Sequence, residues 1–487
     1  MVRDFGVAKD PKDISWYVGI LASSFSLCQI ITVMFWGSLS DRIGRRPVML
    51  TGLIGNIFGF LLLGLSKNFA MALAARCMVG LLNGNVGVTK SIMGELTDNT
   101  NRSRGFALLS LCWHLGAIIG PTIGGMLARP AEIYPSIFGG VWLFETFPYA
   151  LPCMVGSALS VFGAVHCYLN HKETLHRPPS AKGGLACDRL PRAARAHTAE
   201  DSRDAQATPP VSECDEAGLA NNTAADPSSV SVFTPLVRKV MFLSCIFTLA
   251  FSMSDEIYPV WAASETEVGG LGFDSRMISF SLGIIGFIVI YLQLCVYPKT
   301  ERRRGSIWCY RRGLQLIMPC NIFIPFLSRL AALAQSRADR VLAGTAINTA
   351  LPYYYMLWTL LILLLLLRVC GTVFCFTSIN IILTNVAPST SALGKLNGMQ
   401  QLLGAAMGMT GPLLAGGLWS ISIKHTWPFP FNFHFVWNFI AVLSLWALGL
   451  SWSIPDTVNR FEAMEREAKE DDDGTVACTD HAPGADN

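Results

Sequence analysis

The chain has 487 residues, of which 52% are hydrophobic and only 15% are charged, and its mean hydropathy is +0.42. So few charged side chains cannot cover the surface of a soluble protein of this length, so the composition excludes most soluble classes and indicates a polytopic membrane protein. The formal net charge of +3 is too small to predict a nucleic-acid partner. The 14 cysteines lie mostly in apolar runs, so we expect neither a disulfide scaffold nor a metal site.

Eleven apolar runs are long enough to cross a bilayer, which predicts an all-α fold of membrane-spanning helices. They cover residues 14–36, 48–65, 69–91, 105–127, 147–169, 240–263, 277–297, 313–333, 353–379, 396–419 and 433–454. Five runs precede a polar insert and six follow it. We therefore predict an N-terminal bundle over residues 1–170, a disordered linker over 171–235, a C-terminal bundle over 236–455 and an acidic disordered tail over 456–487.

Basic residues in the short loops predict the orientation of these spans. Arginines follow the first, third and seventh runs, whereas the loops on the other side are mostly acidic or sparse in charge, with Arg337 and Arg340 as exceptions. The basic loops, the insert and the tail are thus predicted to be cytoplasmic, and Met1 lies on the other side. Residues 1–13 contain no apolar stretch, so no cleavable signal peptide is predicted and the first run must direct insertion.

Residues 76–125 and 368–417 share an order of features, which indicates an internal repeat. Each stretch begins with an arginine inside an apolar run and ends with a Gly-Pro element, at residues 120–125 and 411–417. Aligning the two halves on these elements leaves the first half one span short. We expect a first helix to be missing, through either a start assigned too far downstream or a genuinely truncated product.

The loop after the first run carries the most specific motif. Residues 37–47 read GSLSDRIGRRP, and this basic, glycine-containing turn with one acid resembles the signature loop of the major facilitator superfamily. The resemblance is closest to its drug:proton antiporter branch, similar to zinc-induced facilitators and tetracycline exporters, and residues 145–152, 172–175, 255–261 and 269–273 also resemble that branch. It implies two bundles of six helices and places this loop between the second and third helices, in agreement with a missing first helix.

Three charged residues are candidates for a gate. Asp41 can pair with Arg45 one helical turn away, or accept hydrogen bonds from the N-terminus of a helix in the other half. By resemblance, Arg45 also pairs with Glu95. The alternative is that these charges serve only as topology determinants.

Two arginines and two acids inside apolar runs are candidates for proton coupling or the substrate cavity, because intramembrane charges are costly. Arg76 either couples to a proton site or extends toward the outer face, and Arg368 is its counterpart in the second repeat. Asp255 and Glu256 lie either in the outer third of a span, where they can carry protons, or in the loop after an early helix end.

The fifth family helix contributes the remaining candidates. Gly116, Gly120, Pro121, Gly124 and Gly125 resemble the antiporter motif of the branch, in which small residues permit close helix contact and proline kinks the helix. His114 nearby either titrates or binds a metal, or is a hydrogen-bonded core residue.

These features predict a proton-coupled antiporter that exports a small organic molecule or drug by alternating access. No ATP-binding Gly-Lys-Ser/Thr loop occurs, so a primary pump is disfavoured; we expect no enzymatic activity and no cofactor. The expected partners are the substrate, protons and the bilayer, with a monomer in the vacuolar or plasma membrane. The alternatives are a transport-inactive paralogue, a membrane nutrient sensor or a truncated gene product.

Overall fold

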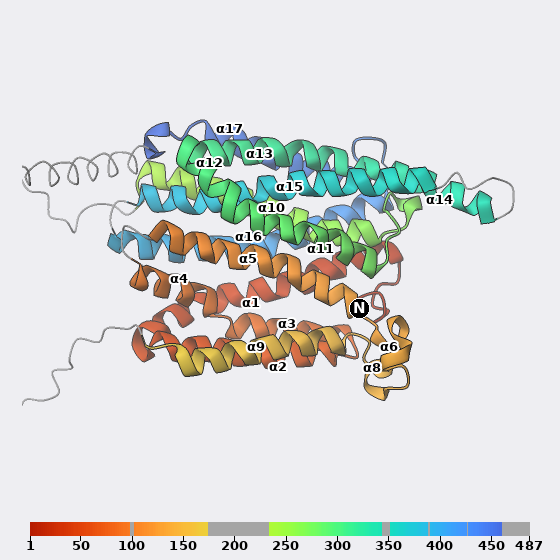
Figure 1. The fold of residues 1–487 in the computed structure, drawn as a ribbon, viewed down its shortest axis with the longest axis horizontal. Coiled ribbons are helices and arrows are strands. Elements are labelled where there is room, and N and C mark those ends of the chain that lie inside the picture. Colours follow the sequence, from red (N-terminus) through yellow and green to blue (C-terminus); the bar gives the residue numbers. More distant parts are fainter. Residues whose placement is uncertain (98–101, 174–232, 343–350, 388–389, 426, 460–487) are drawn as a thin grey trace, which may run out of the picture. The chain divides into compact units, whose positions relative to one another are not determined.

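The structure is a computed structural model that describes residues 1–97, 102–173, 233–342, 351–387, 390–425 and 427–459. These residues belong to one compact unit. Within these ranges the chain is almost entirely helical and contains no strand, and the long helices lie alongside one another (Figure 1). The predicted all-α membrane fold is therefore confirmed.

The first half of the chain, up to residue 173, contains six long or medium helices and several short ones. Their bounds are α1 Ile14–Ile43, α2 Arg45–Gly64, α3 Phe69–Leu82, α4 Asn85–Leu96, α5 Arg102–Met126, α6 Pro130–Ile133, α7 Pro135–Phe138, α8 Trp142–Thr146 and α9 Ala150–Asn170. The predicted third span is divided at Asn83 and Gly84 into α3 and α4. Asn68 caps α3, because its side chain accepts a hydrogen bond from the backbone N–H of Met71 at 2.8 Å.

The second half, from residue 233, contains the remaining helices. Their bounds are α10 Pro235–Ala263, α11 Ser275–Tyr291, α12 Tyr297–Arg304, α13 Ser306–Phe323, α14 Leu327–Leu342, α15 Leu351–Val386, α16 Thr390–Lys424 and α17 Phe435–Ser451. A π-helical turn, Leu292–Val296, joins α11 to α12. The 3₁₀ turn η6, Asp456–Asn459, follows α17.

The predicted spans match these helices. Among the described residues, ten helical segments are long and apolar enough to cross a membrane, and α17, with 17 residues, is a shorter apolar helix at the eleventh position. The first half therefore shows five candidate spans and the second half six. The alternative of an early helix end near Asp255 is wrong, because α10 continues through both acids to Ala263.

The two halves meet along several helix pairs, and in two of these glycine permits close approach. Helix α1 packs against α16, where a Cβ atom on Gly19 would lie 2.6 Å from the carbonyl oxygen of Pro412. Helix α5 packs against α11, where a Cβ atom on Gly125 would lie 2.8 Å from the carbonyl oxygen of Ser275. Burial in the second half is extensive and includes Trp261, Trp419 and Trp437. At both interfaces, glycine thus lets the backbones of the two helices approach each other closely.

Two ends of the helices are distinguished by their loops. We call the end where α1 meets α2 and where α12 ends in Arg302, Arg303 and Arg304 the basic end; the helices reach it on the left of Figure 1. The other end carries the N-terminus, α6 and α8 and is called the opposite end. Almost all of the predicted linker and tail, at 174–232 and 460–487, falls outside the described residues.

Candidate functional site

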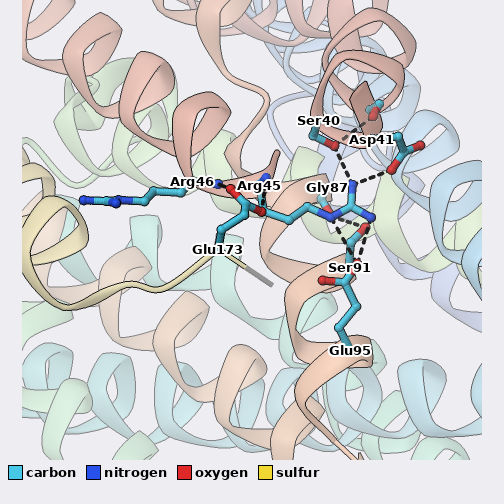
Figure 2. A network of polar contacts seen from close by, with 9 residues as sticks. Ser40, Asp41, Arg45, Arg46, Gly87, Ser91, Glu95 and Glu173 are labelled. Atoms are coloured by element: carbon cyan, nitrogen blue, oxygen red, sulfur yellow. Dashed lines mark hydrogen bonds and ion pairs between the residues drawn. The ribbon is translucent and has the colours of Figure 1, made fainter. Parts of the chain in front are cut away.

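Three side chains meet around Arg45 at the basic end, and we call Ser40, Asp41, Arg45 and Glu95 the gate network (Figure 2). The Arg45 guanidinium donates through Nη1 to Asp41 Oδ1 and, at 2.7 Å, to Ser40 Oγ. It also donates to Glu95 Oε1 from Nε at 3.1 Å and from Nη2 at 2.9 Å. One cation therefore joins α1, α2 and α4.

The gate network is formed by local chain geometry and burial together. Asp41 lies in the last turn of α1, while Arg45 begins α2 directly after Gly44, whose φ of +111° turns the chain. The Arg45 side chain is only 10% exposed, which makes an uncompensated charge costly there. Both acids thus compensate a cation that is largely removed from water. Of the two contacts predicted for Asp41, the structure shows the one with Arg45.

Farther from the basic end, a cation of the first half interacts electrostatically with an acid of the second half. Arg76 on α3 and Glu256 on α10 are near enough that each acts on the charge of the other. The Arg76 Nε donates to the Leu21 carbonyl at 3.4 Å, and its guanidinium lies 5.6 Å from the centre of the Phe25 ring. These contacts place the Arg76 guanidinium against α1.

The neighbouring acid makes a different pair. Asp255 acts on the charge of Arg368, which lies in the middle of α15 and is 7% exposed. Successive residues of an α-helix are about 100° apart around its axis, so the side chains of Asp255 and Glu256 lie near different neighbours. Pro259 lacks the N–H that would bond the Asp255 carbonyl, which weakens the helix at this turn. Helix α10 thus carries two acids: Asp255 interacts electrostatically with a cation of its own half, and Glu256 with a cation of the other half.

A cavity reaches one of these acids. It has a volume of about 770 Å³, is lined by Glu256 and Pro259, and extends to Arg129, Glu265 and Arg276 at the opposite end. Arg368 instead lines a separate cavity of about 10 Å³. Glu256 is therefore the member of the acidic pair that lines a cavity large enough for a small organic molecule.

The predicted antiporter glycines behave unequally. A Cβ atom on Gly125 would lie 1.7 Å from Ser279 Oγ, and the Pro121 carbonyl accepts from that hydroxyl at 3.2 Å. Cβ atoms on Gly116, Gly120 and Gly124 would have nothing within 4 Å. The expectation that all these small residues permit close helix contact is correct only at Gly125, because the other three lie four residues apart on a face turned away from α11.

His114 is a buried residue of α5 whose Nδ1 lies 2.7 Å from the Ser110 carbonyl oxygen. Its ring packs edge-on to Phe376, with the ring centres 5.2 Å apart, and its Nε2 has no hydrogen-bond partner in the part of the chain that the structure describes. These contacts favour the interpretation of a core histidine.

Sequence reasoning missed contacts between residues distant in the chain. Asp13, just before α1, accepts from Lys424 Nζ at 2.5 Å and from Ser420 Oγ at 3.1 Å at the end of α16. The Ser23 hydroxyl on α1 donates to the Met409 carbonyl at 2.7 Å. No local signal predicts such pairs. Ser40 had a signal, because it belongs to the motif loop.

Comparisons with known proteins identify this arrangement. The family model described as Major Facilitator Superfamily matches residues 1–334. The chain belongs to the major facilitator superfamily. The predicted resemblance is thereby confirmed.

Relatives within the superfamily include transporters of fungi and plants. The chain is 27% identical over 518 residues to the major facilitator superfamily multidrug transporter mfsB of Aspergillus fumigatus, covering 97% of this chain and 80% of that protein. It is 33% identical over 337 residues to Protein ZINC INDUCED FACILITATOR 1 of Arabidopsis thaliana, covering 69% and 66%. The crystal structure of the human organic anion transporter MFSD10 (TETRAN) matches with a TM-score of 0.56 and 20% identity over 92% of this chain and 86% of that one. That last likeness shows the major facilitator fold. The chain is thus a multi-pass membrane transporter of this superfamily.

Proposed function

We propose that this major facilitator is a proton-coupled antiporter that exports a small organic molecule by alternating access. The observation that carries the proposal is the position of Glu256, an acid inside α10 that lines the 770 Å³ cavity and attracts the charge of Arg76 in the other half of the chain. Inside a membrane protein, unlike charges attract strongly because the dielectric is low. Protonation of Glu256 removes that attraction, so one proton changes the free energy that holds the halves together.

The gate network supplies the second part of the mechanism. Arg45, Asp41 and Glu95 all belong to the first half and hold the ends of α1, α2 and α4 together at the basic end. If the basic end is cytoplasmic, as the positive-inside rule predicts, the network stabilises the first half at its cytoplasmic face. The cavity meanwhile connects Glu256 with the opposite end. In this arrangement protons reach Glu256 from outside the cytoplasm.

Two fungal relatives support export as the direction of transport. One is the multidrug transporter already described, and another is the efflux pump azaK of Aspergillus niger, to which the chain is 27% identical over 457 residues. Their names describe those proteins. For this chain, export follows if protons move inward through Glu256 while substrate moves outward.

Reconstitution in proteoliposomes tests the proposal. Flux of ethidium, a fluorescent cation, and fluorescein, a fluorescent anion, is measured with and without an imposed pH gradient. We expect the gradient to accelerate the flux of at least one probe, and Asp41→Asn to reduce it. Binding of either probe without any flux, with or without the pH gradient, would refute antiport and support a membrane sensor or an inactive paralogue.

A further inference from the structure

Glu173, at the end of the first half in sequence, contacts the loop between α1 and α2 that carries the signature motif. It follows α9, and its carboxylate accepts from the backbone N–H of Arg45 at 2.7 Å and of Arg46 at 3.2 Å (Figure 2). These are among the N–H groups at the start of α2 that lack a helical acceptor. A Cβ atom on Gly44 would lie 2.4 Å from Glu173 Oε2, so glycine makes room for the carboxylate.

A second contact fastens the same two helices. The Arg46 guanidinium donates to the Tyr168 carbonyl in the last turn of α9 and lies 5.1 Å from the centre of the Tyr168 ring. The end of α9 is thus attached to the start of α2 by both a carboxylate and a cation.

The second half repeats this arrangement with an uncharged side chain. Asn459 follows α17, and its Oδ1 accepts from the backbone N–H of Ile307 in the first turn of α13 at 3.4 Å. Gly305 precedes α13 with a φ of +83°, and a Cβ atom there would lie 2.6 Å from Asn459 Nδ2. In each half, the segment after the last helix therefore returns to cap a helix that begins after a glycine with positive φ.

We propose that Glu173 is a positioning residue for Arg45. The side chain of Arg45 must reach acids on two other helices, and this requires a fixed backbone at the first residue of α2. A carboxylate suits that position, because it accepts two N–H groups and is favoured by the helix dipole. Asn459 is the counterpart in the second half. The importance of this positioning for transport rests on the proposed function, whereas the positioning itself does not.

The experiment measures positioning without transport. In the full-length chain in detergent, hydrogen exchange of the Arg45 and Arg46 amides is followed in wild type, Glu173→Gln and Glu173→Ala, with Lys172→Ala as a neighbouring control. We expect exchange about fivefold faster in Glu173→Ala, a smaller increase in Glu173→Gln because one oxygen still accepts, and no change in Lys172→Ala. Exchange that is unchanged in Glu173→Ala would overturn the proposal.

A second measurement separates positioning from general destabilisation. The coupling between Arg45 and Glu95 is measured by a double-mutant cycle with and without Glu173→Ala, and the pair of Asp13 and Lys424 serves as the control. We expect the coupling constant of the first pair to fall about fivefold, with the control pair unchanged. An equal loss in both pairs would mean a purely structural role and contradict the proposal. If the first coupling alone falls but no probe is transported, the positioning stands and the proposed antiport fails.

Discussion

Arg45 should be coupled far more strongly to Glu95 than to Asp41, although both carboxylates contact the same guanidinium. Glu95 accepts from two nitrogens of Arg45 and is 31% exposed, whereas Asp41 accepts from one nitrogen and is 65% exposed. A charge-assisted bond to a largely buried arginine contributes roughly 2 kcal/mol, discounted here for the partial exposure of Glu95. A contact through one nitrogen to a carboxylate that is mostly exposed, as at Asp41, contributes about 0.5 kcal/mol.

Two double-mutant cycles measure this difference. The variants Arg45→Gln, Glu95→Gln and Asp41→Asn are combined pairwise, and the free energy of unfolding is followed by circular dichroism during titration with SDS. We expect a coupling of about 2 kcal/mol for Arg45 with Glu95 and about 0.5 kcal/mol for Arg45 with Asp41. Equal couplings, or a larger one with Asp41, would refute the reasoning that burial and the number of donors determine the strength of each contact.

Three further predictions concern helix packing, pH and an ion pair between the halves. Gly125→Ala should destabilise the chain by about 1–3 kcal/mol through overpacking against Ser275 and Ser279, whereas Gly120→Ala should be tolerated; thermal unfolding distinguishes them, and equal effects would contradict the α5–α11 interface. Burial, with a smaller effect of Arg329, lowers the pKa of His434 to about 4. Because this pKa lies below the unfolded value of about 6.5, the free energy of unfolding should be highest at pH 7.5 and fall by about 2 kcal/mol by pH 5. His434→Gln should flatten this pH dependence, and an unchanged slope in that variant would show that His434 does not cause it. Asp13 and Lys424 are each about one-third exposed, so Lys424→Gln should lower stability only slightly, and by less in high salt; a large or salt-independent loss would contradict an ion-pair effect.

The local features of this protein follow from its sequence more readily than the distant ones. The spans are evident because each needs only a continuous apolar run, and the contact of Asp41 with Arg45 joins residues of one short loop motif that lie only four apart in the chain. The spacing of Asp255 and Glu256 also implies that they face different neighbours. Their partners Arg368 and Arg76 belong to other helices, so the pairing depends on how these helices pack.

Contacts between residues far apart in the sequence could not be predicted at all. Glu173 reaches the start of α2 across more than a hundred residues, and Asp13 meets Lys424 from the other end of the chain. Neither contact has a periodic or local signature. The glycines of α5 are similar in this respect. Their spacing predicts a helix face of small residues, but it does not reveal that Gly125 is the one that packs against another helix.

The central claim is that Glu256 carries the coupled proton, and Glu256→Gln tests it most directly. This substitution keeps the side-chain size but removes the titrating group, while Glu265→Gln, in the same cavity lining, serves as the control. Proteoliposomes are assayed for accumulation of a transported probe driven by a pH gradient and for exchange of that probe at equal pH. The account predicts that Glu256→Gln loses gradient-driven accumulation but retains exchange, whereas Glu265→Gln retains both. Gradient-driven accumulation at the wild-type level in Glu256→Gln would contradict it.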